Sequence, residues 1–501
     1  MKLGIDLGTT RTIVALVDRG NYPVVSFTDP DGDSVEHIPS VVAREGDRLV
    51  YGFEAERAAS EGALLVRSFK RALASGGVAG QSTLDVDGHQ AGLLEVMTGF
   101  LSHVADQLRT ASNIAGLLAD DEPLEAVVAV PAHAHSAQRF LTLEASRRAG
   151  FHVLGMLNEP SAAGFEFTHR QPRSVNSRRT RVVVYDLGGG TFDASLVRVD
   201  DLSHEVIGSV GINRLGGDDF DEVLAGLARA EVGSRVELTD RERASLLAEC
   251  RVAKENLSPQ SKRIALEVGH APVVVDVGDF YAEATPLVEA SLDALEPLLG
   301  GLDGGRLEAA EVAGIYLVGG ASSLPLVARV LRERFGRRVH RSPYPAASTA
   351  IGLAIAADEN SGFHLTDRLS RGFGVFREWD SGTQLAFDAI LDRDQRTSPD
   401  TDVVMTRRYR PVHNIGVFRF VEYSALGPTG QPTGDVLPLA EVVFPFDRAV
   451  RGVEDLSTVP VERTGEGPEI EETYVIDRHG IVTAAITDVE AGFTLTSRLG
   501  G

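Results

Sequence analysis

The sequence predicts an α/β domain over residues 1–358, a connection over 359–371 and an all-β domain over 372–501. Up to about residue 358, apolar strands alternate with amphipathic helices, which is typical of α/β layers. After Asn360-Ser361-Gly362 no long helical periodicity remains, and short β-rich runs are separated by Gly, Pro and Asp turns. This change in pattern divides the 501 residues into two domains.

The strands of the first domain are short apolar runs, and its helices have apolar residues that recur every three or four positions. Strands are expected at 2–6, 12–18, 126–130, 182–186, 194–199 and 314–318. Helices are expected at 54–74, 92–118, 135–149, 219–232, 240–257, 284–299 and 323–335.

The second domain contains β-rich runs of five to nine residues separated by turn residues, which is typical of a β-sandwich. They lie at 383–391, 415–422, 439–446, 473–477 and 481–487. We interpret Trp379 and Phe376 as core residues of this sandwich rather than as a cage for a ligand.

The charge balance limits what the protein can bind. Asp and Glu number 72 against 49 Lys and Arg, so the net charge is −23. Such a chain repels nucleic acids and anionic lipid, and we expect neither as a partner. Its one cysteine, Cys250, can form neither an internal disulfide nor a cysteine zinc site, which fits a reducing compartment. Without a secretory signal or a long apolar run, the expected location is the cytoplasm.

One turn motif occurs twice. Gly4–Thr10 reads GIDLGTT, and Tyr185–Thr191 reads YDLGGGT. Each copy follows an apolar strand and precedes another, so each predicts a strand, a tight turn and a second strand. The repeat suggests a duplicated domain with two turns that face one cleft.

These turns have the residues that a phosphate site needs. Glycines can adopt positive φ and have no Cβ, so backbone N–H groups can converge on an anion. The glycines are Gly8, Gly188, Gly189 and Gly190, and the neighbouring hydroxyl donors are Thr9, Thr10 and Thr191. Asp6 and Asp186 end their strands, where they can hold a hydrated magnesium ion. A single such turn could be a plain hairpin, but two copies favour phosphate binding.

The turns belong to a longer series of motifs that resembles the nucleotide-binding domain of the seventy-kilodalton heat-shock chaperones. The motifs are GIDLGTT, AVPA (129–132), NEPSAAG (158–164), VVVYDLGGGTFDAS (182–195), LGGDDFD (215–221), CRVAKENLS (250–258) and YLVGGASSLP (316–325). They follow the family's order and spacing. The resemblance implies an actin-like, duplicated ribonuclease H-like fold that binds ATP or ADP with Mg²⁺ between two lobes.

The resemblance also implies residue roles. Lys70, Glu159, Asp186 and Thr191 match the family's catalytic positions, and Asp6 and Asp186 match its magnesium site, which acts mainly through water. The nucleotide-binding positions are Gly8, Thr9, Thr10, Arg11, Gly188, Gly189, Gly190, Gly216, Gly217, Lys254, Ser258, Gly319 and Gly320. Asp193 completes the second hairpin. Pro131 and Arg139 match the pair that relays nucleotide state to the second domain.

Residues near the expected base and ribose depart from the family. Glu255 and Ser323 stand where two arginines sandwich the adenine. Arg251 replaces a ribose-side glutamate, and Ala346 replaces an aspartate. Arg251 and Glu255 are four apart on a helix, so we expect them to pair with each other. Weak ATP binding and poor discrimination against GTP follow.

The second domain resembles the family's peptide-binding β-sandwich, most clearly at 475–484 (VIDRHGIVTA). The chain ends at Gly501, so we expect no helical lid. The leucine-rich acidic connector is replaced by 362–369, and Gly155 stands where an arginine contacts J-domain partners. These departures predict weak coupling between the domains.

His133 and His135 could suggest a metal site, but the family has none there.

Three functions fit this sequence. The first is a slow ATPase with chaperone-like binding of unfolded or extended polypeptide, and with J-domain and exchange-factor partners as further candidates. The second is a nucleotide-binding scaffold or regulator with one dedicated partner. The third, a metabolite kinase of the same superfamily, leaves the β-domain unexplained.

Overall fold

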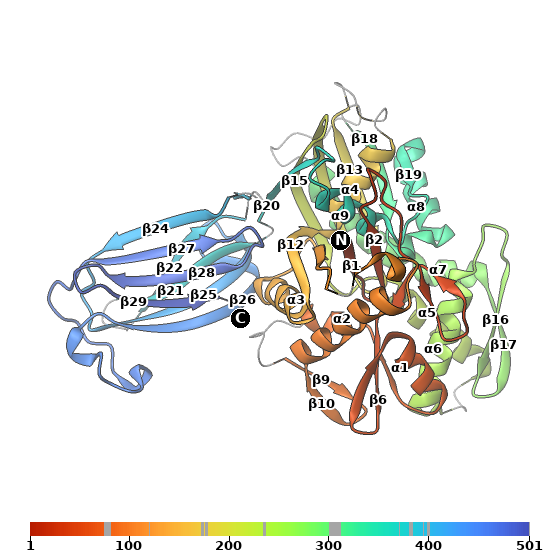
Figure 1. Ribbon diagram of the computed structural model, residues 1–501, viewed down its shortest axis with the longest axis horizontal. Helices are drawn as coiled ribbons and strands as arrows, with labels where there is room; N and C mark the ends of the chain where they lie inside the picture. The colour runs from red at the N-terminus through yellow and green to blue at the C-terminus, as the bar shows by residue number, and fades with distance from the viewer. Residues whose placement is uncertain are drawn as a thin grey trace.

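Two large sheets, each built around a hairpin, organise the α/β part of the computed structural model (Figure 1). The structure describes residues 1–74, 82–119, 121–171, 175, 179–233, 237–299, 312–369, 371–379, 384–393, 395–397 and 401–499. Within these residues, no helix is long and apolar enough to cross a membrane.

The first sheet has the strand order β12-β11-β1-β2-β5. β1 pairs with β2 in antiparallel fashion and with β11 in parallel. The strands are β1 (Lys2–Leu7), β2 (Arg11–Leu16), β5 (Ile38–Pro39), β11 (Leu124–Val130) and β12 (Phe151–Asn158). The helices of this half of the chain are α1 (Gly52–Ser60), α2 (Leu93–Thr110), α3 (Ser136–Arg148) and α4 (Glu159–Arg170).

The second sheet repeats this pairing in the order β19-β18-β13-β14-β15-β20-β23. Its central hairpin pairs β13 with β14, and β13 also pairs with β18 in parallel. The strands are β13 (Arg181–Leu187), β14 (Phe192–Asp200), β15 (Ser203–Ile212), β18 (Val312–Val318), β19 (Val339–Arg341), β20 (His364–Arg368) and β23 (Arg396–Thr397). Its helices are α5 (Gly217–Val232), α6 (Asp240–Glu255), α7 (Val277–Leu299) and α8 (Pro325–Phe335).

A last helix, α9 (Ser348–Ala357), packs closely against β1 and α4. A Cβ on Gly4 of β1 would lie 2.3 Å from the backbone oxygen of Ala350. A Cβ on Gly352 would lie 1.8 Å from the backbone oxygen of Ala162 in α4. α9 therefore approaches a strand and another helix closely, at two positions that only glycine tolerates.

Smaller strand pairs and ladders complete the α/β part. They are β3 (Phe27–Thr28) with β4 (Ser34–Val35), β6 (Val41–Glu45) with β7 (Arg48–Tyr51) and β8 (Leu65–Arg67), β9 (Thr83–Val86) with β10 (His89–Gly92), and β16 (Arg263–Val268) with β17 (Ala271–Asp276). Short 3-10 turns lie at η1 (Phe69–Ala74), η3 (Ala115–Leu117), η4 (Gly320–Ser323) and η5 (Gly336–Arg338).

The helix predicted at 54–74 is wrong over its second half. α1 ends at Ser60, and Gly62 adopts a φ of 117° that a helix cannot continue through. Leu65–Arg67 then pairs with β6 as β8, followed by the 3-10 turn that contains Lys70. The helix predicted at 92–118 ends at Thr110. The pairing of β8 with β6 shows how tertiary contacts override an apolar periodicity.

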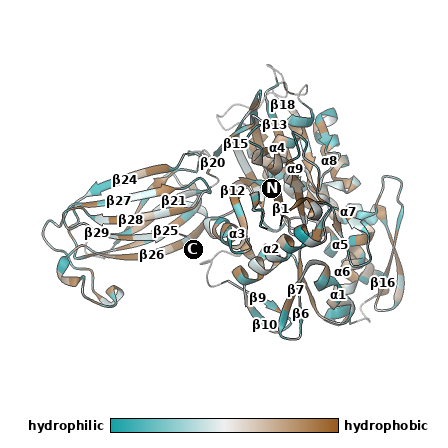
Figure 2. Ribbon diagram, viewed as in Figure 1, coloured by the Kyte–Doolittle hydropathy of each residue, from teal (hydrophilic) through white to brown (hydrophobic). Residues whose placement is uncertain are grey.

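The all-β part consists of two four-stranded sheets, β22-β21-β25-β26 and β24-β27-β28-β29. The strands are β21 (Gly372–Trp379), β22 (Gln384–Leu391), β24 (Val403–Tyr409), β25 (Ile415–Leu426), β26 (Pro432–Pro445), β27 (Ile470–Ile476), β28 (Val482–Asp488) and β29 (Phe493–Arg498); η6 (Arg448–Val450) and η7 (Leu456–Thr458) lie between β26 and β27. Buried and half-buried residues alternate along β27 and β28, which is typical of strands with one face in a core. Figure 2 shows hydrophobic and hydrophilic residues mixed along the strands of the all-β part. The two sheets share one cluster of buried apolar residues.

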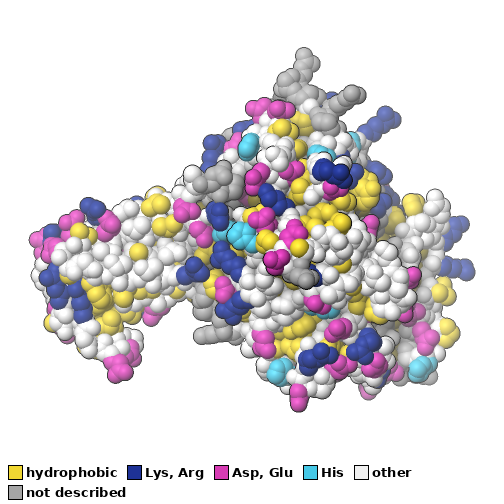
Figure 3. All heavy atoms as spheres, in the orientation of Figure 1, with side chains coloured by type: hydrophobic (Ala, Val, Ile, Leu, Met, Phe, Trp, Pro, Cys, Tyr) yellow, Lys and Arg dark blue, Asp and Glu magenta, His cyan; other side chains and the backbone are white. Residues whose placement is uncertain are grey.

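The segment predicted as the connection contains a strand. β20 pairs with β15 of the second large sheet and with β23 from the all-β part. Figure 3 shows Lys, Arg and His side chains gathered where the two parts meet on the visible face. The domain boundaries themselves stay a prediction.

Candidate nucleotide cleft

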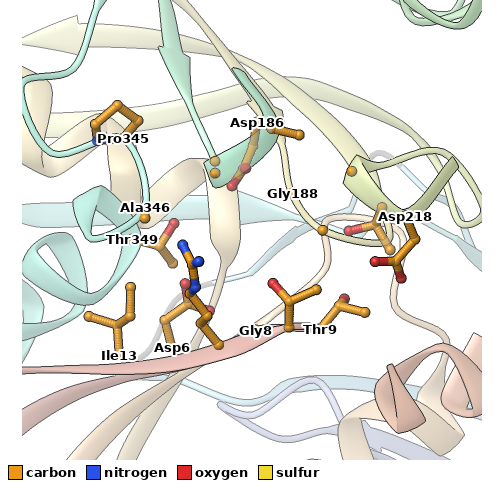
Figure 4. A pocket seen from close by; sticks show the side chains of 18 of the residues that line it. Asp6, Gly8, Thr9, Ile13, Asp186, Gly188, Asp218, Pro345, Ala346 and Thr349 are labelled. Carbon is orange, nitrogen blue, oxygen red and sulfur yellow. The ribbon is translucent and has the colours of Figure 1, made fainter. Parts of the chain in front are cut away.

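The two glycine turns lie against each other between the sheets. A Cβ on Gly189 would lie 2.4 Å from Thr10, and one on Gly190 would lie 2.6 Å from Thr9. Neither turn could hold larger residues without separating from the other. Figure 4 shows Asp6 and Thr9 on one side of the cavity and Asp186 on the other.

Most of the predicted site residues line this cleft. They are Asp6, Gly8, Thr9, Thr10, Arg11, Lys70, Glu159, Asp186, Gly188, Gly189, Thr191, Gly217, Lys254, Gly319 and Gly320. Gly190 and Gly216 are buried and do not line the cleft. They pack against each other, and a Cβ on Gly216 would be 2.5 Å from the Gly190 nitrogen. Ser258 lies outside the cleft, exposed and within hydrogen-bond distance of the Ser261 hydroxyl.

Lys70 and Glu159 form a buried ion pair on the floor of the cleft, with 2.6 Å between Nζ and Oε1. Burial alone would lower the pKa of Lys70, but the charges of Glu159 and Asp6 outweigh it and raise the pKa. The lysine is therefore held as a cation inside the protein. Its position follows from η1, which directs residue 70 inward where a regular helix had been expected.

Carboxylates outnumber cations around Lys70. Burial and the charge of Glu159 raise the pKa of Asp6 and of Asp193 to about 7, although Asp6 keeps some surface open to the cleft. The pKa of Asp186 is raised well above its ordinary value by the same causes. Four buried or half-buried carboxylates around one ammonium are electrostatically unfavourable unless a further cation neutralises them.

This donor set fits magnesium. Within the described part of the chain, no three His, Cys, Asp or Glu side chains lie close enough to hold a metal ion directly. Magnesium usually keeps several waters and binds through one or two carboxylates together with phosphate oxygens. Asp6 and Asp186, facing the glycine turns, suit that mode of binding.

The wall formed by α5 and α6 contains a connected set of ion pairs. Arg251 contacts Asp218 at 2.7 Å and Asp221 at 3.4 Å, and Lys254 contacts Asp221 at 2.6 Å. Glu255 pairs with Arg11 across the mouth of the cleft at 2.5 Å. The expected pairing of Arg251 with Glu255 is therefore wrong. Helical spacing allowed that pair, but stronger partners on other elements take both side chains.

Further contacts across the cleft were not predicted from the sequence. The Ser68 hydroxyl donates to Asp218 at 2.5 Å, and Arg71 pairs with Asp219 at 2.8 Å. Asp219 also accepts from the Gly216 N–H at 2.8 Å, which fixes the start of α5. The double aspartate of the LGGDDFD motif could have indicated ion pairs at this position. The sequence alone did not identify the partners, because they lie about 150 residues away.

The segment from Pro131 to Arg139 connects the cleft with the all-β part. The Ala132 N–H donates to Asp193 at 2.9 Å. Arg139 donates to Asn158 at 2.7 Å, and Asn158 donates to Asp367 at 2.8 Å. Arg139 also lies 3.5 Å from the backbone oxygen of His479 in the β27–β28 turn. Burial lowers the pKa of His133 and His135 in this segment to about 4, so both are neutral.

The all-β part has a groove of about 350 Å³ beside β21 and the start of β25. Trp379 lines it and is 64% exposed, so its assignment to the sandwich core is wrong. It is the last residue of β21, where the burial of that strand ends. Phe376 is half-buried and packs on Phe387 at 4.9 Å between ring centroids.

Comparison with known proteins gives consistent matches. A family model described as Hsp70 protein matches residues 101–389. A chaperone protein HscA homolog from Methylibium petroleiphilum is 34% identical over 379 residues, which cover 72% of this chain and 58% of that protein. The chaperone protein HscA of Klebsiella pneumoniae subsp. pneumoniae is 35% identical over 373 residues, covering 71% of this chain and 57% of its own length. The chain thus spans less than two thirds of the relatives it matches.

Proposed function

The chain belongs to the Hsp70 family, and we propose from this premise that it is an ATP-dependent chaperone with a slow magnesium-dependent ATPase. Membership of this family implies an actin-like ATPase domain followed by a β-sandwich. The two large sheets of the α/β part, each built around a hairpin, are consistent with the first domain, and the two four-stranded sheets of the all-β part are consistent with the second. The observation that carries the proposal is the buried Lys70–Glu159 pair beside two glycine turns.

The proposed chemistry uses residues that meet in the cleft. The glycine turns bind the phosphates of ATP through backbone N–H groups. Lys70 offsets charge on the terminal phosphate, and Glu159, Asp186 and Thr191 position the attacking water and the hydrated metal. Asp6 and Asp186 would hold a hydrated magnesium ion, which would supply positive charge to the phosphate oxygens. Catalysis of this kind is mainly positioning and electrostatic stabilisation.

The second half of the proposal is that the all-β domain, which we place at 372–501, binds extended polypeptide in its groove. Trp379 and Val412, both exposed and apolar, line that groove. Backbone groups of the neighbouring strands and an aromatic rim are typical of peptide recognition. The two relatives named above, a chaperone protein HscA and a chaperone protein HscA homolog, support the same class.

A peptide array with and without ATP tests this function. A chaperone is expected to bind many apolar peptides and to release them differently with ATP, whereas a scaffold for one dedicated partner binds one sequence or none. Trp379→Ser should weaken peptide binding. Leu117→Ser, which also changes an exposed apolar side chain but on the α/β part, should not. If both variants bind peptide equally well, the groove is not the peptide-binding site.

A further inference from the structure

The loop between β26 and β27 passes behind one wall of the groove in the all-β part. We call residues 447–469 the strap; it contains η6 and η7 and projects at the end of the all-β part that is away from the α/β part (Figure 1). The wall is the turn between β24 and β25, whose residues 410–413 line the groove. None of the strap residues, all of which the structure describes, lines the groove.

A separate cavity of about 460 Å³ lies on the strap side of this wall. Strap residues 464–468 line it, and it shares Arg410, His413 and Phe446 with the groove. These three side chains therefore stand between the groove and the strap. The strap can act on the groove only through the wall.

The strap adds a short antiparallel strand to the back of the wall. The Thr464 N–H donates to the Val412 oxygen at 2.7 Å, and the Asn414 N–H donates to the Glu462 oxygen at 3.0 Å. A β-bridge lies between these two hydrogen bonds. Because antiparallel pairing fixes both the spacing and the register of two segments, the strap determines where the wall lies.

Asn414 connects the wall with two separate parts of the strap. Its side chain is buried, donates through Nδ2 to the Pro460 oxygen at 3.0 Å and accepts at Oδ1 from the Glu462 N–H at 2.8 Å. Its backbone oxygen accepts from the Asp447 N–H at 2.8 Å. Both the donor and the acceptor of the amide are thus used to hold the strap.

Gly467 lets the strap approach the wall closely. Its N–H donates to the Pro411 oxygen at 2.8 Å, and a Cβ on Gly467 would lie 2.9 Å from that same oxygen. An alanine here has to push the strap and the wall apart. A Cβ on Gly465, two positions earlier, would meet no atom within 4 Å. The two glycines therefore form a matched pair, of which only Gly467 requires the missing side chain.

The opposite wall is held as well. Trp379 lines it, and the neighbouring Glu378 accepts from the Val417 N–H at 3.0 Å and pairs with Arg419 at 2.7 Å. Hydrogen bonds therefore fix both walls of the groove independently of any ligand. A preformed site avoids the free-energy cost of ordering its walls when a ligand binds.

We propose that the strap is a positioning element for peptide binding: Asn414 and Gly467 fix the wall and so set how long an extended apolar peptide stays in the groove, although neither residue lines it. The proposal rests on peptide binding in the groove, as described above. A wall that is free to move loses its contacts with the peptide more readily. The effect therefore falls on the dissociation rate more than on the association rate.

Stopped-flow fluorescence of Trp379, the single tryptophan of the chain, tests this with a tryptophan-free peptide of alternating leucine and serine. Gly467→Ala should release the peptide about tenfold faster than the wild type, the usual effect of losing one or two hydrogen bonds, with the association rate within about twofold. Gly465→Ala should release it at the wild-type rate. Asn414→Ala should also be about tenfold faster, and Asn414→Asp, which keeps Oδ1 but loses the donor, should lie between.

Hydrogen exchange without peptide gives a second measurement. The N–H groups of Thr464 and Gly467 should be protected in the wild type and in Gly465→Ala, and should exchange faster in Gly467→Ala. A Gly467→Ala protein that loses protection or melts at a lower temperature, yet releases peptide at the wild-type rate, would show that the strap supports only the fold.

The remaining outcomes separate this inference from the function beneath it. If the wild type binds neither the probe nor any peptide of the array, the peptide-binding function fails and the inference fails with it. If the wild type binds and both Gly467→Ala and Asn414→Ala release peptide at its rate, the strap proposal alone is overturned. Equally fast release by Gly465→Ala would also overturn it, because contact with the wall would then not be the cause.

Discussion

Glu422 of β25 accepts hydrogen bonds from Ser136, the first residue of α3, through both the backbone N–H, at 3.1 and 3.2 Å, and the side-chain hydroxyl. The contact joins the all-β part to the segment from Pro131 to Arg139, whose Ala132 N–H donates to Asp193 in the cleft. A carboxylate at a helix N-terminus is favoured by the unpaired N–H groups and the helix dipole. The replaced connector at 362–369 and Gly155 predict weak coupling between the α/β part and the all-β part. The buried contact between Glu422 and Ser136 is a place where this coupling can be tested.

We predict that Glu422→Ala separates the two parts more readily. Burial raises the pKa of Glu422, and its hydrogen bonds with Ser136 and the charges of Arg371 and Arg139 offset part of this cost. Loss of hydrogen bonds to a charged group costs about 1.5–3 kcal/mol. Limited proteolysis of the connection at 359–371 should therefore be faster. Glu441→Ala, at an exposed glutamate of β26, is the control. Equal cleavage of both variants would show that the contact does not hold the parts together.

The cleft carboxylates predict a pH dependence of stability without nucleotide. The folded protein raises the pKa of Asp6 and Asp193 from 3.8 to about 7. Between these values the folded state binds protons that the unfolded state does not, so the free energy of unfolding falls as pH rises from about 4 to 7. Thermal melts from pH 5 to 8 should show this decline, and ADP with magnesium should stabilise most at the upper end. Asp6→Asn should flatten the curve; a curve unchanged by it would exclude this cause.

Nucleotide selectivity is expected to be weak. Glu255 is held by Arg11, and the side chain of Ser323 does not line the cleft, so neither provides a stacking cation for the base. ATP and GTP should bind with affinities within a few-fold of each other in calorimetry. Ser323→Arg should strengthen ATP binding roughly two- to thirty-fold through a cation–π contact, with Ser323→Ala unchanged. Strong preference of the wild type for ATP would mean that another residue recognises the base.

Local patterns predicted the parts of the site that depend on local geometry. The two turns follow from glycines, aspartates and threonines within a few residues of each other, and the structure brings both turns into one cleft. The pairs Arg11–Glu255 and Ser136–Glu422 join residues 244 and 286 positions apart, and no periodicity specifies such partners. Lys70 was identified by resemblance alone, since periodicity placed it in a helix that the chain does not form.

Single-turnover hydrolysis of ATP by Lys70→Ala is the most direct test of the proposed function. If Lys70 offsets charge on the transferred phosphate, its loss should slow hydrolysis about a hundred- to a thousand-fold, with magnesium required in the wild type. Lys70→Gln should be equally slow. Because the glutamine side chain can still donate a hydrogen bond to Glu159, this second variant controls for a folding defect caused by leaving Glu159 without a partner. Lys262→Ala, at an exposed lysine, should hydrolyse ATP at the wild-type rate. A folded Lys70→Ala protein that hydrolyses ATP within a few-fold of the wild-type rate would contradict the account.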